Sequence, residues 1–389
     1  MFNESLRLKL SAGEGLGSFL DRTAQPPKDG PLSDAVVVSA DNHYTLTEDI
    51  WFNGFPDHLK DKAPRIWWDE KARIHQIGED FKTSFPDDLQ RVLHDMEDHD
   101  GTGNLTARLS HLDAEGISKE IVFPQVVQLF FRHPDLEIRS WIYRIYNDHM
   151  AQVQAASGNR IFPVAIPEFW DLQAFPESIR RIKESGFKAI LMPNLPGKMA
   201  DGRNLIYNSD EYDDVWSAIE ESGLPICHHL AEAFTPAEGI NGEGVSVVTD
   251  FGASVFRKLF AQYTIGRIFD KHPRLKVVFA EANISWIPGT LQDAELACNS
   301  HAFRFDAIPD KRPFWYWHNN CYATFMNDPA GLRLLDIIGS ERVMWSVDYP
   351  HPESTFGYTQ DSKQAVIDAA GEKDARLILG ETAIKIFNL

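Results

Sequence analysis

The feature that most constrains the fold of this chain is a repeated alternation of short apolar segments with longer segments of helical pattern. The apolar segments are rich in β-branched residues and nearly continuous, which is typical of parallel strands buried on both faces. The eight predicted strands span residues 35–43, 118–125, 161–167, 187–193, 224–229, 275–281, 320–325 and 342–348. The predicted helices span residues 136–156, 172–185, 210–222, 250–271, 290–304, 328–339 and 362–371.

Strands that alternate with helices in this number predict an α/β fold of the (β/α)₈ TIM-barrel class. A doubly wound open sheet is the alternative, because it uses the same alternation. The chain has 389 residues, which fits one large barrel with additions. We therefore divide it into an N-terminal extension at 1–34, which is marked by several glycines and prolines, and a barrel at 35–389.

The additions to the barrel are expected on the face where barrel enzymes carry their active sites. Residues 44–100 form an insertion after the first strand, and residues 230–249 follow the fifth strand. Segments that follow strands lie at the carboxyl-terminal face of a barrel. The first insertion is rich in aromatic residues, among them Trp51 and Phe52, which are candidate substrate contacts because they could cover a flat apolar ring.

Composition and charge exclude several classes of function. The formal net charge is −19 at pH 7, and such an acidic surface repels nucleic-acid phosphates and anionic lipids. No apolar run reaches the roughly 18 residues of a membrane-spanning helix, and the N-terminus lacks the apolar core of a signal peptide. The few cysteines, Cys227, Cys298 and Cys321, argue against a disulfide framework. We therefore expect a cytoplasmic protein that binds a small molecule, and neither nucleic acid nor membrane.

Polar side chains stand at the carboxyl-terminal ends of several of these apolar strands. The first strand ends in Asp41, Asn42 and His43. Because side chains alternate along a strand, Asp41 and His43 share one face, and together they form a usual starting pair for a divalent metal ion. The fifth strand ends in His228 and His229, of which only one can face the barrel axis.

Three further polar residues follow the same pattern. The sixth strand ends at Glu281 and the eighth at Asp348, and His351 follows in the next loop, where it could contact the substrate. Each acidic residue taken alone could be an ordinary helix cap. Several such strand ends converge on one barrel face, however, and buried carboxylates and imidazoles are costly unless they are paired or bind a metal. The pattern therefore favours a metal site over structural caps.

Six motifs, in their order and spacing, resemble the amidohydrolase-related family within the amidohydrolase superfamily. They are SADNH, GNRIFPVAIPE, GFKAILMPN, LPICHH, HPRLKVVFAEANISWIP and RVMWSVDYPHPEST, and they are spread over residues 35–389. The branch that they resemble contains aminocarboxymuconate-semialdehyde decarboxylase and the resorcylate and carboxyvanillate decarboxylases. The resemblance also implies a (β/α)₈ barrel.

The same resemblance implies one divalent ion, Zn²⁺ or Mn²⁺. The ligands implied by position are Asp41, His43, His229 and Asp348. His229 matches rather than His228, since the family's ligand stands five residues after the leucine of the LP pair. Many relatives carry a histidine where this chain has Glu281, so their histidine-based proton transfer does not carry over. Asp348 and Glu281 are therefore the candidate catalytic residues.

Two reactions remain open within this family. We favour nonoxidative decarboxylation of an aromatic or conjugated carboxylic acid, in which Asp348 carries the proton and Glu281 assists. The alternative is a hydrolase of a C–N, C–O or C–C bond that uses metal-activated water. A third hypothesis is an inactive barrel that only binds ligands, which the intact ligand set argues against. The length of the N-terminal extension and of the first insertion suggests a homodimer or a higher homo-oligomer.

Overall fold

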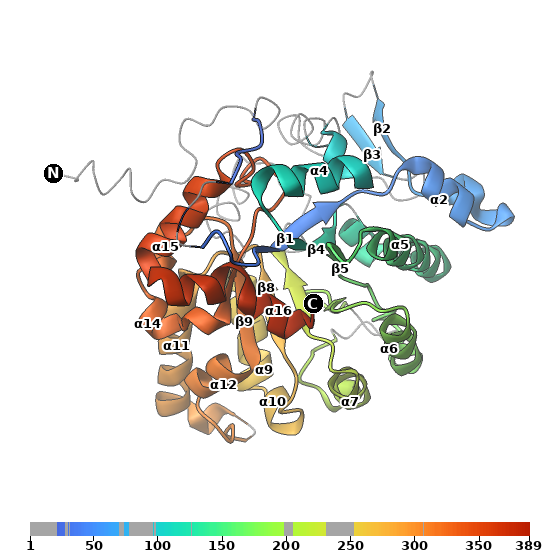
Figure 1. Ribbon diagram of the computed structural model, residues 1–389. Coiled ribbons are helices and arrows are strands. Elements are labelled where there is room, and N and C mark those ends of the chain that lie inside the picture. Colours follow the sequence, from blue (N-terminus) through green and yellow to red (C-terminus); the bar gives the residue numbers. More distant parts are fainter. Residues whose placement is uncertain are drawn as a thin grey trace.

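Figure 1 shows the computed structural model of the chain, in which helices surround a central group of strands. The structure describes residues 22–27, 30, 32–69, 74–77, 96, 99–125, 127–197, 205–230, 253–305 and 307–389. Each of the predicted strands is confirmed, most of them shorter than predicted. They are β1 (Val38–Tyr44), β4 (Lys119–Pro124), β5 (Ile161–Pro163), β6 (Ile190–Leu191), β7 (Ile226–His229), β8 (Val277–Ala280), β9 (Cys321–Phe325) and β10 (Val343–Trp345).

Backbone hydrogen bonds join these strands into one ring. The strands form two parallel sheets, with the orders β1-β4-β5 and β10-β9-β8-β7-β6. Next to β5, Ala165 forms a parallel bridge with Ile190 of β6. After β10, the N–H of Asp348 donates to the carbonyl of Asp41 in β1 at 2.9 Å. The predicted (β/α)₈ barrel is therefore confirmed, and the open-sheet alternative is wrong.

Helices cover the outside of the ring, and most of the predicted ones are confirmed. The helix predicted at 136–156 has the same bounds in the structure, as α5 (Leu136–Ala156), and the side chain of Asp135 caps its first turn. The helix predicted to end before Gly223 does so, and Gly223 has a left-handed φ of 70°. The helix that ends before Gly223 is α7 (Asp213–Ser222), and the other confirmed helices are α6 (Phe175–Glu184), α11 (Trp286–Ser300) and α15 (Thr359–Arg376). Two predicted segments each hold two shorter helices instead of one: 250–271 holds α9 (Ala253–Thr264) and α10 (Ile268–Lys271), and 328–339 holds α13 (Pro329–Leu332) and α14 (Leu335–Ile338).

Several helices differ from the prediction for local reasons. The segment 250–271 contains two helices, α9 and α10, because Arg267 between them has a left-handed φ of 67°. Helix α15 runs past the predicted end at residue 371 and contains a non-helical Gly371 with φ 74°. Helix α4 (Leu105–Glu115), which Asn104 caps, is the helix expected after the insertion at 44–100, whose bounds the sequence did not define. The short helices α12 (Pro313–Asn320) and α16 (Thr382–Phe387) were not predicted at all.

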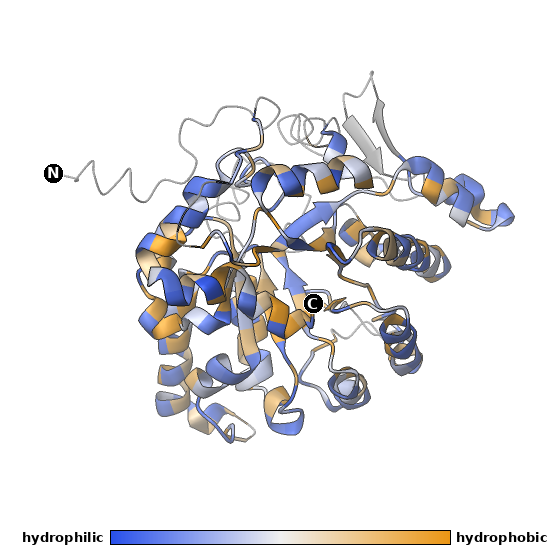
Figure 2. Cartoon of the chain, in the orientation of Figure 1, coloured by the Kyte–Doolittle hydropathy of each residue, from blue (hydrophilic) through white to orange (hydrophobic). Residues whose placement is uncertain are grey.

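The centre of the barrel contains an unusually polar strand. Figure 2 shows β1 as a hydrophilic strand in the middle of the molecule. All of its residues are buried, including Ser39, Asp41, Asn42 and His43. Buried polar groups are costly unless they have hydrogen-bond or metal partners, so the polar side chains of β1 should have such partners inside the barrel.

The structure describes the additions to the barrel only in part. The first insertion contains α2 (Glu48–Gly54), a 3-10 helix (Asp57–Lys62) and an antiparallel pair of strands, β2 (Ile66–Asp69) and β3 (Ile74–Ile77). Most of the predicted N-terminal extension and of the segment 230–249 lies outside the described residues. Within the described ranges, no helix combines the length and the apolar character that crossing a membrane requires.

Candidate metal centre

The carboxyl-terminal end of β1 supplies two side chains to the mouth of the barrel. Asp41 and His43 are buried on the same side, and Oδ1 of Asp41 lies 4.0 Å from Nε2 of His43. Asn42 points to the other side, where its Nδ2 donates to Glu120 of β4 at 2.5 Å. The pairing of β1 with β4 shifts its register between Ser39 and Asn42, an irregularity of the kind that re-aims side chains beside active sites. The predicted alternation along this strand is confirmed.

The two histidines of β7 face opposite sides of the strand. Nε2 of His229 lies 3.4 Å from Oδ1 of Asp41, so His229 faces the barrel axis. Nε2 of His228 lies 2.9 Å from the hydroxyl of Tyr263 on α9, so His228 faces the helix layer. Burial lowers the pKa of His228 to about 3, and its imidazole is therefore neutral. The prediction that only one of the two faces inward is confirmed.

Glu281 and Asp348 leave their strands through left-handed backbone turns, with φ angles of 72° and 60°. Residues other than glycine rarely adopt this conformation, and those that do cluster at active sites. The N–H of Glu281 donates to Oγ1 of Thr324 at 2.9 Å, and the Thr324 hydroxyl donates to Oδ2 of Asp41 at 3.1 Å. Thr324 therefore links the backbone at Glu281 to the side chain of Asp41 in β1.

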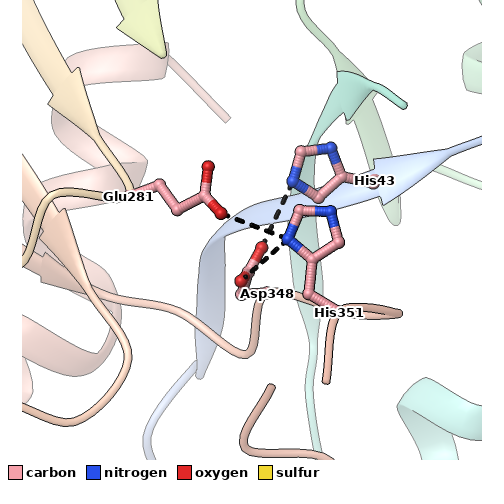
Figure 3. Close-up of side chains that lie close together, drawn as sticks. All are labelled: His43, Glu281, Asp348 and His351. Carbon is pink, nitrogen blue, oxygen red and sulfur yellow. Dashed lines mark hydrogen bonds and ion pairs between the residues drawn. The ribbon is translucent and has the colours of Figure 1, made fainter. Parts of the chain in front are cut away.

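His351 joins the cluster from the loop that follows β10, as Figure 3 shows. Its Nδ1 lies 3.1 Å from Oε1 of Glu281 and 3.1 Å from Oδ2 of Asp348. On the other side of the ring, its Nε2 lies 3.1 Å from Nε2 of Gln125. The side chain is 14% exposed, which makes it the most accessible of the group. His351 is therefore well placed for the substrate contact that the sequence predicts, and that contact stays a prediction.

The facing ligand atoms have an unmet bonding capacity that fits a metal ion. Among the described residues, Oδ1 of Asp41, Nε2 of His43 and Oδ1 of Asp348 are buried without a hydrogen-bond partner. Nε2 of His43 lies 3.2 Å from Oδ1 of Asp348. A tetrahedral ion about 2.1 Å from each ligand separates neighbouring ligand atoms by roughly 3.4 Å. The 3.2 Å observed here and the 3.4 Å between Oδ1 of Asp41 and Nε2 of His229 are of that size. The 4.0 Å between Oδ1 of Asp41 and Nε2 of His43 is wider, so the residues fit a divalent ion after a small inward shift of one side chain.

Two overlapping groups of side chains could share such an ion, since the ligand atoms within each group lie within 4.8 Å of one another. The first group contains Asp41, His43 and His229, which are three of the four ligands implied by the sequence. The second group contains His43, Glu281, Asp348 and His351. The four implied ligands thus lie in two neighbouring groups that share His43, with Asp41 and His229 in one group and Asp348, beside Glu281 and His351, in the other.

Burial and opposed charges shift the acid–base properties of these groups. Burial raises the pKa of Asp348 well above its ordinary value. Burial opposes charge on His351 too, but the carboxylates of Asp348 and Glu281 raise the pKa of this imidazole well above its ordinary value. Burial, with the nearby rings of His351 and His229, lowers the pKa of His43 well below its ordinary value. His43 is therefore neutral, as a metal ligand must be.

The aromatic residues proposed as substrate contacts lie in different surroundings. Trp51 is 4% exposed and belongs to the hydrophobic core, whereas Phe52 is 43% exposed with Nζ of Lys60 5.5 Å from its ring centroid. Their contact with a substrate stays a prediction. Sequence reasoning missed Thr324 and Gln125, although both stand at carboxyl-terminal strand ends, the same signal that singled out the other residues.

Comparison with known proteins identifies the family. A family model described as Amidohydrolase matches residues 97–389, a range that includes His229, Glu281, Asp348 and His351. A γ-resorcylate decarboxylase from Rhodococcus jostii is 25% identical over 316 residues, which are 76% of this chain and 85% of that protein.

Solved structures share the fold at lower identity. An amidohydrolase from Mycobacterium avium subsp. paratuberculosis superposes with a TM-score of 0.71 at 18% identity, over 91% of this chain and 99% of that chain. A 5-carboxyvanillate decarboxylase from Novosphingobium aromaticivorans, complexed with manganese and 4-hydroxy-3-methoxy-5-nitrobenzoic acid, gives a TM-score of 0.67 at 20% identity, over 94% and 100%. Because the family model matches more than half of its residues, this chain belongs to the amidohydrolase family.

Proposed function

We propose that this protein is a metal-dependent enzyme that removes the carboxyl group of an aromatic or conjugated carboxylic acid as CO₂, without oxidation. The proposal rests on the buried set of ligand atoms and on His351, whose Nδ1 lies between the carboxyl groups of Glu281 and Asp348. The known relatives support this direction, since two of them are named as decarboxylases of aromatic acids.

The proposed ligands of the ion are Asp41, His43, His229 and Asp348. Two imidazoles and two carboxylates suit both Zn²⁺ and Mn²⁺. Mn²⁺ has the additional support of the manganese in the 5-carboxyvanillate decarboxylase structure. When bound, the ion supplies Lewis acidity and a template for the substrate's carboxylate and a neighbouring hydroxyl group.

The protein's own groups would move one proton in each turnover. Nδ1 of His351 faces the carboxyl groups of both Asp348 and Glu281, so a proton can pass among these three groups and reach Asp348 before each turnover. In the proposed step, Asp348 transfers its proton to the ring carbon that bears the carboxylate. The bond between that carbon and the carboxylate carbon then breaks, CO₂ leaves, and the bonding electron pair restores the aromatic ring. His351 and Glu281 return a proton to Asp348.

Hydrolysis is the second candidate, because the matching family is described as that of amidohydrolases. In that case Asp348 would accept a proton from the attacking water instead of donating one to carbon. The two candidates use the same residues and differ in the fate of the substrate. Only decarboxylation places a new hydrogen on carbon and releases CO₂.

An experiment in D₂O separates the two. Purified protein is stripped with a chelator, reloaded with Mn²⁺ or Zn²⁺, and incubated with aromatic acids that carry a hydroxyl next to the carboxylate, and with matched esters, amides and lactones. Decarboxylation is expected to release CO₂ and to place one deuterium on the ring, which NMR detects. Cleavage of the esters, amides or lactones without CO₂ release would overturn the proposal in favour of hydrolysis.

We also propose that the protein is cytoplasmic and forms a homodimer or a higher homo-oligomer. The buried and free state of Cys227, Cys298 and Cys321 supports a reducing compartment. Large exposed apolar side chains such as Phe303 and Ile308, 83% and 64% exposed, support a contact with another subunit. Light scattering after gel filtration tests the oligomer, and a monomer at micromolar concentration would contradict it.

A further inference from the structure

A buried charged network lies behind β1, on the side that faces away from the ligand cluster. Its members are Arg108 of α4, Glu120 of β4 and Asn42 of β1, each no more than 1% exposed. Nε of Arg108 lies 2.9 Å from Oε1 of Glu120, and Nη2 lies 2.6 Å from Oε2. This two-pronged contact fixes the relative orientation of the guanidinium and the carboxylate.

Asn42 joins this ion pair to two of the three segments that carry ligands of the proposed ion. Its Nδ2 donates to Oε2 of Glu120 at 2.5 Å, and its Oδ1 accepts from the N–H of Tyr349 at 2.9 Å. In the sequence, Asn42 stands between two proposed ligands, and Tyr349 directly follows a third. One buried amide therefore connects the backbone segments of three of the four ligands.

Tyr349 is held by further contacts of the same network. The guanidinium of Arg108 lies 4.0 Å from the centroid of the Tyr349 ring, a cation–π geometry. The carbonyl of Tyr349 accepts from the N–H of His43 at 2.7 Å. The loop after β10 is thus fixed to β1 through both polar backbone groups of this tyrosine, and to α4 through its ring.

Stability alone is a poor reason for such a network. Burying an ion pair costs desolvation, and replacing it with apolar residues of similar volume is often neutral or stabilising. What the network does supply is a fixed position for the backbone next to the ligands. We infer that Arg108, Glu120 and Asn42 are positioning residues that keep Asp41, His43 and Asp348 at metal-binding separations. This inference rests on the proposed metal site.

A single substitution at Asn42 is the first test of the inference. Asn42→Asp keeps the shape and the acceptor for the Tyr349 N–H, but it places a second carboxylate against Glu120. We expect this variant to fold, by circular dichroism, and to bind Mn²⁺ about 10- to 100-fold more weakly in a chelator competition assay, as is usual when a partner behind a metal ligand is lost.

The double variant Asn42→Asp/Glu120→Gln exchanges the amide and the carboxylate. The introduced glutamine can then donate to the introduced aspartate, and one negative charge remains for Arg108. The NH2 group of the glutamine takes the place of the oxygen that accepts from Nη2 of Arg108, so only the hydrogen bond from Nε of Arg108 is kept. We therefore expect the Mn²⁺ affinity to recover only in part, to a value clearly above that of Asn42→Asp and below that of wild type.

Asn320→Asp is the matched control for a merely structural effect. Asn320 is also 1% exposed, and its Nδ2 donates to the carbonyls of Pro273 and Leu275. It directly precedes β9, at the end of the barrel opposite the ligands. We expect this control to lower the melting temperature and to leave the Mn²⁺ affinity of the folded protein unchanged.

Three results would overturn the inference. One is an unchanged Mn²⁺ affinity in Asn42→Asp, another is a double variant no better than the single one, and the third is an equal loss in the control. Failure of the wild type to bind Mn²⁺ would remove the proposed function as well, so the two failures are distinguishable. If Asn42→Asp does not fold, Arg108→Lys replaces it, because lysine keeps the charge and loses the two-pronged contact. We expect the same loss of Mn²⁺ affinity, about 10- to 100-fold, in this variant. An unchanged affinity would overturn the inference.

Discussion

The imidazole of His351 stacks on the imidazole of His43, with ring centroids 4.1 Å apart and an angle of 22° between the planes. The two rings differ in how readily they bind a proton, because the pKa of His351 is raised and that of His43 is lowered. A charged ring thus lies over a neutral one, and a positive charge on His351 keeps protons away from His43. The arrangement separates a group that can carry a proton from a group that can bind a metal.

Removing either member of the closest proposed ligand pair should abolish turnover while leaving the fold intact. His43→Ala and Asp348→Asn each remove a metal contact, and the loss should exceed the roughly 100-fold cost of losing a partner behind a ligand. Circular dichroism, bound metal per chain and turnover are measured on both variants. Full activity in either would contradict the proposed site.

The neighbouring histidines of β7 provide a matched pair for testing the ligand set. His229→Gln is expected to lower bound metal and turnover together, because His229 faces Asp41. His228→Gln removes an equally buried ring that faces Tyr263, so it should lower the melting temperature but keep the metal. Metal analysis and thermal unfolding of both proteins check this, and loss of metal in the His228 variant would argue against the assignment.

Glu281→Gln separates a proton-transfer role from a ligand role. Burial alone would raise the pKa of Glu281, but the facing imidazoles of His229 and His351 lower it below its ordinary value, which favours the ionised form. The variant keeps the shape and loses the charge. We expect kcat to fall by about 100-fold or more, as for loss of a general acid–base group, with metal content unchanged. A parallel loss of metal would instead make Glu281 a ligand.

The buried neutral imidazole of His228 should make the protein sensitive to acid. Its pKa of about 3 in the folded state lies below the ordinary 6.5, so below pH 6.5 the unfolded chain binds a proton that the folded protein does not. The stability that this residue contributes is complete above pH 6.5 and is lost at about 1.4 kcal/mol per pH unit as the pH falls toward 3. Urea unfolding should therefore show a shallower acid decline for His228→Gln than for wild type, and equal slopes would contradict this.

The sequence predicted the barrel and the polar residues at its strand ends because both depend on local pattern. Apolar runs show where strands lie, and polar residues such as Asp41 and Asp348 stand out at the strand ends. Alternation shows that His228 and His229 face opposite sides of their strand, but it does not show which side faces the barrel axis. The structure decides this, because His228 contacts Tyr263 in the helix layer and His229 contacts Asp41 at the barrel axis.

The network behind β1 could not be predicted in the same way. Asn42 contacts Glu120, 78 residues away, and Tyr349, 307 residues away, and no local pattern encodes such pairs. Helix α4, which carries Arg108, was expected after the first insertion, but without bounds that would place Arg108 on it. Breaks such as the one at Arg267 depend on a single backbone angle, which a periodic pattern of apolar residues does not reveal.

The left-handed turn at Glu281 restricts which amino acids this rim of the barrel tolerates at low cost. A side chain with a β-carbon costs about 1–2 kcal/mol in this conformation, and glycine is free of that penalty. A library that selects only for heat resistance should therefore drift toward glycine at position 281 and give up the carboxylate. Substitutions meant to raise the stability of the protein without loss of function should therefore avoid position 281 and be sought elsewhere in the chain.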